Sequence, residues 1–378
     1  MTRRVLFHVQ HLLGIGHLRR AAALAKSCAE HGLDVTLASG GAAIDHLDTG
    51  GAALVQLPSL RAADSGFTRL LDEGGQDIDD GWRAGRRAAS LDLFARIRPD
   101  VLVIETFPFG RRQLAFELLA LLAAARAAGT VTVCSVRDVL TTRKPERTRQ
   151  AAAWAREHFD HVLVHGDPGF IAFGESFPAA AEIEGKLVYT GYVASGAPLV
   201  AGDLGRDEII VSAGGGAVGE GLLRTALAAQ AIFGNRRWRL LAGDNLPAAA
   251  FAALAGDAPE NVLVERARPD FPMMLLNAAV SVSQAGYNTV VDLLAAQTPA
   301  VLAPFAGPGE TEQTLRAEKL EARGLAQCLV EDNLTAERLA EAVMRALDGP
   351  PPPPHGIALD GARRSAEMIA GWADDQLA

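Results

Sequence analysis

Short apolar runs alternate with longer helix-like stretches along most of the chain, and this alternation constrains the fold more than any other feature. An apolar run at residues 5–9 is followed by a turn with two glycines at 14–16 and by an Ala/Leu-rich stretch over 17–31. The same order returns with apolar runs at 101–105 and 131–136. Near-continuous apolar strands separated by helices are typical of a parallel sheet covered on both faces. We therefore expect an α/β fold.

The alternation stops once and then begins again, which indicates two domains. Residues 192–206 are mostly small residues, glycine and proline, as in a linker. After them come an apolar run at 208–212, a glycine turn and another helix-like stretch. We predict Rossmann-like domains over 1–195 and 206–349. A helix over 355–376 follows five prolines and is predicted to pack back on the N-terminal domain.

The charge is distributed unevenly between the two halves. The net charge is −9, and residues 1–193 contain 22 Lys and Arg against 22 Asp and Glu, so the acidic excess lies entirely in the second half. Non-specific nucleic-acid binding depends on basic surfaces that release counterions. We therefore expect no nucleic-acid partner. If the second half binds an anion, local backbone geometry has to form the site.

Cysteine usage and hydropathy favour a cytoplasmic protein. The three cysteines form no CxxC pair, which argues against a zinc site or a disulfide framework. The longest strongly apolar run, residues 118–125, is far shorter than the ~20 residues that cross a bilayer. Arginines and lysines gathered over 83–149 leave open a peripheral contact with the inner face of the membrane.

The turn after the first predicted strand brings a histidine to the start of a helix. Gly16 and His17 lie in the segment LGIGHLRRA. A helix N-terminus presents free N–H groups and a partial positive charge, and glycine lets a ligand come close. A histidine there is a candidate general base, with helix capping as the alternative. Glu105 and Asp138 follow two other predicted strands, so either can assist His17 or cap the next helix.

Three adjacent glycines open the second domain. Gly214, Gly215 and Gly216 follow the apolar run at 208–212 and precede a helix-like stretch. Successive backbone amides at a helix start can hold a pyrophosphate without a cation. A flexible turn without a ligand is the alternative interpretation.

The segment 281–324 has the order strand, turn, helix, strand, loop, helix. Asp292 lies one helical turn past Asn288 and so on the same face. A carboxylate there can accept hydrogen bonds from both ribose hydroxyls. The alternative interpretation of Asp292, and likewise of Glu312, is an acidic residue near a helix N-terminus that the helix dipole stabilises. The candidate ligand residues of this segment are Gln284, Gly286, Asn288, Asp292, Glu312 and Gln313.

In this order the motifs resemble the MurG-type glycosyltransferases, family 28 of the GT-B superfamily. The resemblance covers most of the chain and is most specific over 283–324. It implies two Rossmann-like domains facing across a cleft, with the nucleotide sugar held mainly by the C-terminal domain and with no metal. His17 falls where that family has its N-terminal glycine turn and histidine. The donor-site residues implied by motif position are Gly214, Gly215 and Gly216 at the diphosphate, Arg266 and Arg268 at the base, Asp292 at the ribose, and Glu312 and Gln313 at the sugar. Gly16, in the first glycine turn, is a further candidate for binding the nucleotide sugar, because glycine lets a ligand come close.

The function implied by this resemblance is metal-independent sugar transfer with inversion from a nucleotide-diphosphate donor, foremost a UDP-sugar, to an acceptor hydroxyl. The partners are then that donor and an unidentified acceptor, and no cofactor is expected. The segment IGHLRRAAALA is also similar to a turn of the UDP-sugar hydrolase of pseudaminic acid biosynthesis, which passes the sugar to water. A nucleotide-sugar-binding protein without catalysis is the third hypothesis.

Overall fold

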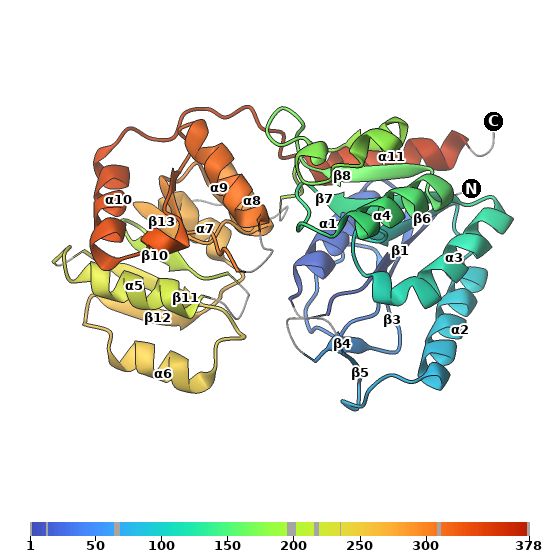
Figure 1. The fold of residues 1–378 in the computed structure, drawn as a ribbon, viewed down its shortest axis with the longest axis horizontal. Coiled ribbons are helices and arrows are strands. Elements are labelled where there is room, and N and C mark those ends of the chain that lie inside the picture. Colours follow the sequence, from blue (N-terminus) through green and yellow to red (C-terminus); the bar gives the residue numbers. More distant parts are fainter. Residues whose placement is uncertain are drawn as a thin grey trace. The chain divides into compact units, whose positions relative to one another are not determined.

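The chain contains two compact units, each built around its own sheet. The computed structural model describes residues 2–12, 14–63, 69–194, 202–214, 219–234, 236–307 and 311–375. The first unit comprises residues 1–196 together with 358–378, and the second comprises 197–357 (Figure 1). Gly215 and Gly216, together with residues 195–201 of the expected linker, lie outside the described residues.

The first unit has a seven-stranded parallel sheet in the order β3-β2-β1-β6-β7-β8-β9. The chain starts in the middle, adds strands on one side and then on the other, as in Rossmann folds. Its strands are β1 (Arg4–Val9), β2 (Asp34–Ser39), β3 (Ala53–Gln56), β6 (Val101–Glu105), β7 (Val131–Arg137), β8 (His161–His165) and β9 (Leu187–Tyr189). An antiparallel pair, β4 (Leu60–Ala62) and β5 (Leu70–Asp72), was not expected from the sequence.

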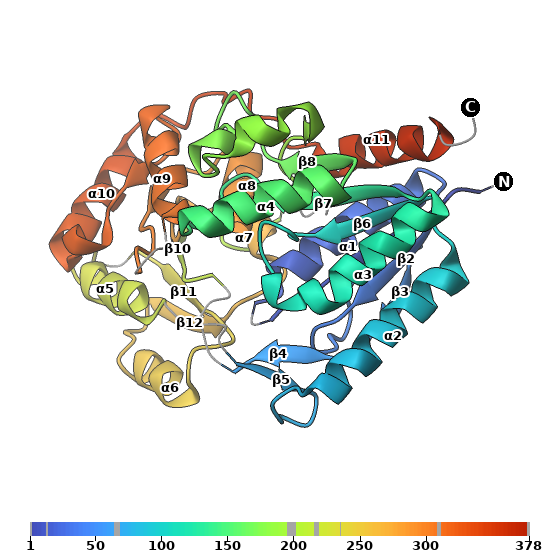
Figure 2. The same ribbon diagram turned by 45° about the vertical axis from the view of Figure 1, so that its right-hand side comes forward.

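Helices cover both faces of this sheet (Figure 2). Successive side chains of a strand point to opposite faces. Accordingly, Leu6 joins the core under α2, α3 and α4, whereas Val5 and Phe7 join the core under α1 and α11. The helices are α1 (Gly16–Glu30), α2 (Asp80–Ile97), α3 (Ala115–Ala128), α4 (Pro145–His158) and α11 (Gly361–Asp375), with the short helices η1 (Arg112–Leu114), η2 (Phe173–Glu175) and η3 (Ala180–Lys186).

The second unit repeats the same topology with six parallel strands in the order β12-β11-β10-β13-β14-β15. The strands are β10 (Ile209–Ser212), β11 (Trp238–Ala242), β12 (Val262–Arg266), β13 (Val280–Ser283), β14 (Ala300–Leu302) and β15 (Gln327–Cys328). The helices are α5 (Glu220–Gln230), α6 (Ala248–Gly256), α7 (Phe271–Asn277), α8 (Tyr287–Ala296), α9 (Glu312–Ala322), η4 (Glu331–Asn333) and α10 (Ala336–Asp348).

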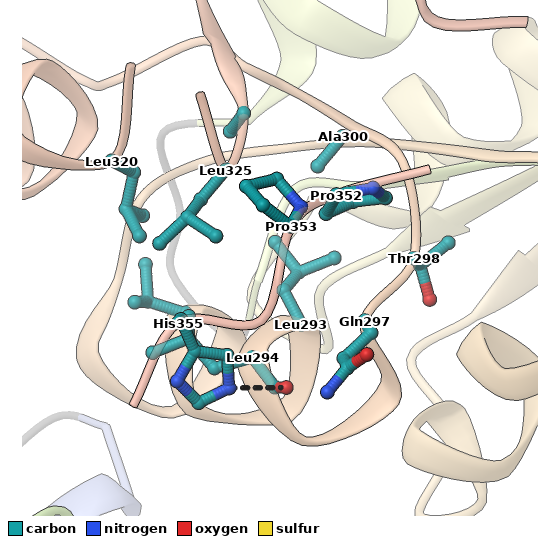
Figure 3. Close-up of a pocket in the computed structure, with 12 residues that line it drawn as sticks. Leu293, Leu294, Gln297, Thr298, Ala300, Leu320, Leu325, Pro352, Pro353 and His355 are labelled. Carbon is teal, nitrogen blue, oxygen red and sulfur yellow. Dashed lines mark hydrogen bonds between the residues drawn. The ribbon is translucent and has the colours of Figure 1, made fainter. Parts of the chain in front are cut away.

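The proline-rich segment after α10 lies against the second unit before the chain returns to the first. Pro352, Pro353 and His355 line an apolar pocket with α8 and β14 (Figure 3). Nε2 of His355 lies 3.2 Å from the carbonyl oxygen of Leu294. The helix that follows starts at Gly361 and packs on α1, so it is shorter at its N-terminal end than the predicted 355–376.

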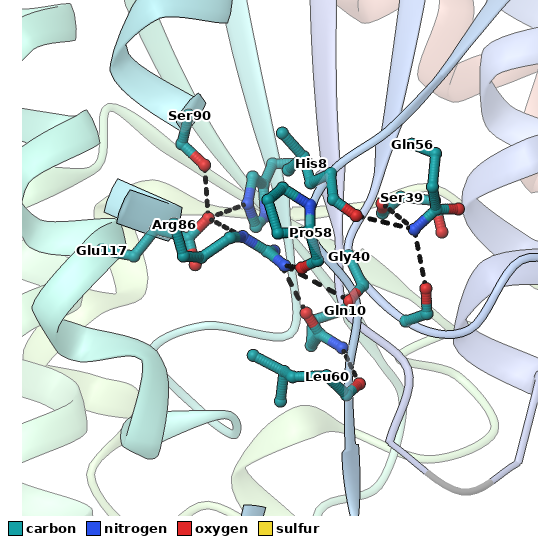
Figure 4. A network of polar contacts seen from close by, with 12 residues as sticks. His8, Gln10, Ser39, Gly40, Gln56, Pro58, Leu60, Arg86, Ser90 and Glu117 are labelled. Atoms are coloured by element: carbon teal, nitrogen blue, oxygen red, sulfur yellow. Dashed lines mark hydrogen bonds and ion pairs between the residues drawn. The ribbon is translucent and has the colours of Figure 1, made fainter. Parts of the chain in front are cut away.

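A buried polar network joins β1 to α2 and α3 (Figure 4). Oε1 of Glu117 accepts hydrogen bonds from Nε of Arg86 at 3.0 Å and Oγ of Ser90 at 2.5 Å, and it lies 2.9 Å from Nε2 of His8. Arg86 also donates to Oε1 of Gln10 at 3.2 Å. Burial raises the pKa of Glu117, but His8 and Arg86 outweigh it and lower the pKa to about 2.

Within the described part of the chain, every helix is too short or too polar to cross a lipid bilayer.

Candidate functional site

His17 lies in the first turn of α1, beside the carboxyl end of the first sheet. Its side chain is 18% exposed, and its Nδ1 is 3.0 Å from Oε1 of Glu105, the last residue of β6. The contact between His17 and Glu105 follows from the strand order, because α1 comes directly after β1 and β6 is the neighbour of β1 in the sheet. No side-chain hydrogen bond caps α1 among the described residues, so the imidazole is held by Glu105 rather than by the helix terminus.

Glu105 is a buried carboxylate that collects several donors. Oε1 accepts a hydrogen bond from Thr106 Oγ1 at 3.0 Å and pairs with the guanidinium of Arg20, while Oε2 accepts from Ser135 Oγ at 2.6 Å. Burial raises the pKa of Glu105, but the Arg20 charge and the His17 hydrogen bond hold it well below its usual range. Glu105 is therefore ionised at neutral pH.

An ionised Glu105 fixes the tautomer of His17. A carboxylate only accepts hydrogen bonds, so Nδ1 of His17 carries the proton. Burial lowers the pKa of His17, and the cations Arg111 and Arg20 lower it further against the opposing effect of Glu105. The ring is then neutral, and Nε2 keeps its lone pair. Nε2 has no hydrogen-bond partner among the described residues, so it is available to take a proton.

Arginines surround this pair and make the carboxyl edge of the sheet cationic. Arg111, between β6 and α3, donates from Nε to the carbonyl oxygen of Gln10 at 2.9 Å. Burial, followed by repulsion from Arg137 and Arg143, lowers the pKa of Arg111 to about 10. Such surroundings favour the neutral form of His17.

Asp138, the other predicted partner of His17, lies elsewhere. Its carboxylate is fully buried after β7 and accepts a hydrogen bond from the Tyr192 hydroxyl at 2.8 Å. The imidazole of His17 instead contacts Glu105, Arg20 and Thr106. Sequence reasoning missed Arg20, although it lies three residues after His17 and therefore on the same face of α1.

In the second unit, Gly214 follows β10 with a φ of +66°, a conformation that favours glycine. The two glycines after it are not described. The next helix, α5, begins at Glu220 with Gly219 as its N-cap residue. The expected diphosphate turn is therefore visible only at its first residue.

The two loops that start α8 and α9 are tied together by one amide. Oε1 of Gln313 accepts hydrogen bonds from the backbone N–H of Ala285 and of Phe305, both at 3.1 Å. This contact holds the β13–α8 turn beside the β14–α9 loop. Glu312, the first residue of α9, is buried and lies 4.0 Å from Arg316.

The other predicted donor residues lie around that same turn. Gln284 is buried at the end of β13, and Gly286 is the N-cap residue of α8. Asn288 is exposed and Asp292 half-buried, and both belong to α8 with the predicted spacing of one turn. The residues from α8 and α9 are thus brought to one edge of the second sheet.

Arg266 and Arg268 are engaged with their own unit. Arg266 donates to the carbonyl oxygens of Gly243 at 3.0 Å and Leu246 at 2.9 Å, which shapes the loop after β11. Arg268 forms an ion pair with Asp270 at 2.8 Å. Among the described residues, no group of three or more His, Cys, Asp and Glu side chains is placed to hold a metal ion.

Residues 255–353 match the model of the glycosyltransferase family 28 C-terminal domain. The C-terminal unit is thus related to family 28 glycosyltransferases. An uncharacterized glycosyltransferase of Methanopyrus kandleri is 32% identical over 95 residues, which are 25% of this chain and 27% of the relative. The UDP-N-acetylglucosamine–N-acetylmuramyl-(pentapeptide) pyrophosphoryl-undecaprenol N-acetylglucosamine transferase of Rhodospirillum centenum is 31% identical over 111 residues, 28% of this chain and 29% of the relative. The chain therefore aligns with only about a quarter of each relative's length.

Solved structures show the same fold over the whole chain. The glycotransferase of kitacinnamycin has a TM-score of 0.67 at 18% identity, with complete coverage of both chains. The MurG of Acinetobacter baumannii has a TM-score of 0.59 at 16% identity, over 98% of this chain and 99% of its own. The predicted GT-B architecture of two Rossmann-like domains and the predicted resemblance to MurG-type glycosyltransferases are confirmed.

Proposed function

We propose that this protein is a metal-independent glycosyltransferase that moves a sugar from a nucleotide-diphosphate donor to an acceptor hydroxyl with inversion. The observation that carries the proposal is the His17–Glu105 pair, with Nδ1 and Oε1 3.0 Å apart at the carboxyl edge of a Rossmann-like sheet. Ligands of such sheets bind at that edge. The family 28 match of the second unit supports a nucleotide-sugar donor.

In the proposed reaction, Nε2 of His17 removes the proton of the acceptor hydroxyl. The hydroxyl oxygen forms a bond to the anomeric carbon while the bond from that carbon to the diphosphate oxygen breaks. A single displacement from the opposite side inverts the anomeric centre. The imidazolium that forms remains hydrogen-bonded through Nδ1 to the Glu105 carboxylate, which stabilises its charge. The proton then passes to water.

On the donor side, we assign the diphosphate to the turn that begins at Gly214, before the N-terminus of α5. The backbone amides and the helix dipole can stabilise the leaving diphosphate without a cation. Asp292 is assigned to the ribose hydroxyls. Arg266 and Arg268 are assigned to the end of the donor that carries the nucleotide base. In this structure their side chains contact the Gly243 carbonyl oxygen and the Asp270 carboxylate, respectively.

The sugar end of the donor is assigned to Glu312 and Gln313 at the start of α9. The carbonyl of Gln313 already holds two loops, which leaves its amide N–H₂ group for the sugar. Uridine is the proposed base, because relatives such as the Rhodospirillum centenum enzyme are named as UDP-N-acetylglucosamine transferases.

The test measures the melting temperature of the wild type with UDP, GDP, TDP and UDP-sugars. A ligand at ~100 times its Kd adds about 2.7 kcal/mol to the free energy of unfolding. We expect a UDP-selective rise that Asp292→Ala abolishes, whereas Asp348→Ala, an exposed carboxylate at the end of α10, retains it. No rise with any nucleotide contradicts the donor site.

A UDP-release assay with UDP-sugars then separates the possible reactions. Release that requires an added acceptor preparation supports transfer. Release in buffer alone, at the same rate with and without acceptor, identifies a hydrolase instead. Binding with no release under either condition identifies a nucleotide-sugar-binding protein without catalysis.

A further inference from the structure

A line of buried polar side chains continues from Glu105 across the first sheet. Oγ of Ser135 lies 2.6 Å from Oε2 of Glu105 and 2.8 Å from Nε2 of His165. Nδ1 of His165 in turn lies 3.0 Å from Oγ1 of Thr190. Ser135, His165 and Thr190 are each at most 1% exposed. The four groups come from β6, β7, β8 and the residue that follows β9, which are successive neighbours in the sheet.

Counting protons shows that this line has one direction. Ser135 has a single hydroxyl proton, and the Glu105 carboxylate can only accept it. Nε2 of His165 must therefore be the donor to Ser135. Burial, with the Arg20 charge, lowers the pKa of His165 to about 3 against the opposing effect of Glu105. The ring is therefore neutral, and since Nε2 carries its proton, Nδ1 carries none. The Thr190 hydroxyl is then the neighbour that can donate to Nδ1, and it also reaches the carbonyl oxygen of Gly191 at 2.9 Å.

We propose that Ser135 and His165 are positioning residues of the reaction, which orient the Glu105 carboxylate and thereby hold His17 in the tautomer whose Nε2 is the base. This inference rests on the proposed function. The directed chain gives Oε2 its donor, so Oε1 stays with His17, Arg20 and Thr106. Without the Ser135 hydroxyl, Oε2 of Glu105 is a buried carboxylate oxygen that has lost its donor, and the carboxylate can rotate away from the imidazole of His17.

The charged groups that act on His17 and His165 come from separate elements of the first unit. Arg20 on α1 and Glu105 on β6 act on both histidines. Arg111, between β6 and α3, also acts on His17, and Arg137 and Arg143 act on Arg111. None of these groups changes in the variants below.

The test uses two matched pairs of variants in the full chain. Gln at position 165 can place its amide N–H₂ where Nε2 donates, whereas Leu has a similar size and no donor. Thr at position 135 keeps the hydroxyl that Ala removes. We expect His165→Leu and Ser135→Ala to lower kcat roughly 10- to 100-fold, as losses of orienting partners do. We expect the donor KM to stay unchanged and His165→Gln and Ser135→Thr to stay within about threefold of the wild type.

A role in packing alone predicts a different pattern, in which kcat follows the melting temperature and His165→Gln is no better than His165→Leu. The same kcat in all four variants overturns the proposal. In Ser135→Ala, the Glu105 carboxylate loses the donor that orients it, and its hydrogen bond to His17, which raises the pKa of that histidine, weakens. The acid limb of the kcat profile is therefore expected to move to lower pH.

A spectroscopic readout keeps this inference separate from the proposed function. In histidine-labelled protein at pH 7, ¹⁵N shifts are expected to show His17 protonated at Nδ1 and His165 protonated at Nε2. His17→Gln and His165→Gln assign the signals. In wild type, the opposite tautomer or an imidazolium at His165 overturns the proposal, whether or not any transferase activity is found.

Discussion

Nδ1 of His17 lies 3.0 Å from Oε1 of Glu105, although 88 residues separate the two along the chain. The contact joins the first turn of α1 to the end of β6, and it exists because β1 and β6 are adjacent in the sheet. The carboxylate fixes the proton on Nδ1 and leaves a lone pair on Nε2, which is the base in the proposed reaction. Both residues can be tested by substitution.

His17→Ala is expected to lower kcat roughly 10²- to 10⁴-fold, the usual contribution of general base catalysis. Nucleotide binding is expected to stay nearly unchanged, because the donor is assigned to the second unit. Steady-state kinetics together with melting curves in UDP measure the two effects. Full activity in His17→Ala would show that another group removes the proton.

Glu105→Gln removes the negative charge that stabilises the imidazolium of His17. We expect kcat to fall roughly 10²- to 10⁴-fold, because the orienting carboxylate and its base act as a unit. The pKa of His17 is expected to fall further, since Glu105 opposes the lowering by burial. The control is Asp138→Asn, which alters the contact with Tyr192. A loss of kcat in the control and not in Glu105→Gln would reverse the assignment.

Which of Glu105 and Asp138 contacts His17 could not be predicted from the sequence, although the fold and the position of His17 could. Alternating apolar runs predicted two parallel sheets, and the glycine turn predicted His17 at the start of α1. Strand order decided the partner, because β6 is next to β1 whereas β7 is one strand further away. Strand order depends on long-range packing that local patterns do not encode. For the same reason, Ser135 and His165 are indistinguishable in the sequence from ordinary strand residues.

The buried Glu117 network predicts a pH-dependent contribution to stability. Glu117 has an ordinary pKa of 4.5 and a pKa of about 2 in the folded chain. A lowered carboxyl pKa stabilises the fold above the ordinary value, and this contribution is lost as the pH falls through the folded value. Glu117→Gln is therefore expected to be less stable than wild type by about 3–5 kcal/mol at pH 7, because Arg86 keeps a buried charge.

Denaturant unfolding at pH 7, 4.5 and 3 measures this difference. It is expected to be unchanged between pH 7 and 5 and to shrink below pH 4.5. The control is Glu182→Gln, whose partner Arg156 is 58% exposed. A difference between Glu117→Gln and wild type that does not vary with pH would contradict an ionised Glu117.

Gln313 is expected to matter through its carbonyl oxygen. Gln313→Ala leaves the N–H groups of Ala285 and Phe305 without this acceptor, which costs about 1–3 kcal/mol for a buried donor. We expect a lower melting temperature and a higher donor KM. Gln313→Glu keeps an acceptor oxygen and is expected to retain the stability while altering the sugar contact. Equal melting temperatures for wild type and Gln313→Ala would exclude the loop-tying role.

The exposed cations at the start of α4 predict binding to an anionic membrane surface. Arg147 and Arg149 are exposed there, and each Lys or Arg near such a surface contributes about 1 kcal/mol. Replacing both by glutamate is expected to weaken vesicle binding at least roughly 30-fold at low salt. Co-sedimentation with phosphatidylglycerol vesicles measures it. The control, Arg338→Glu with Arg345→Glu, makes the same charge change on α10 and is expected to bind like wild type. Equal weakening in both double variants would mean that net charge alone acts, and no sedimentation of the wild type would exclude the membrane contact.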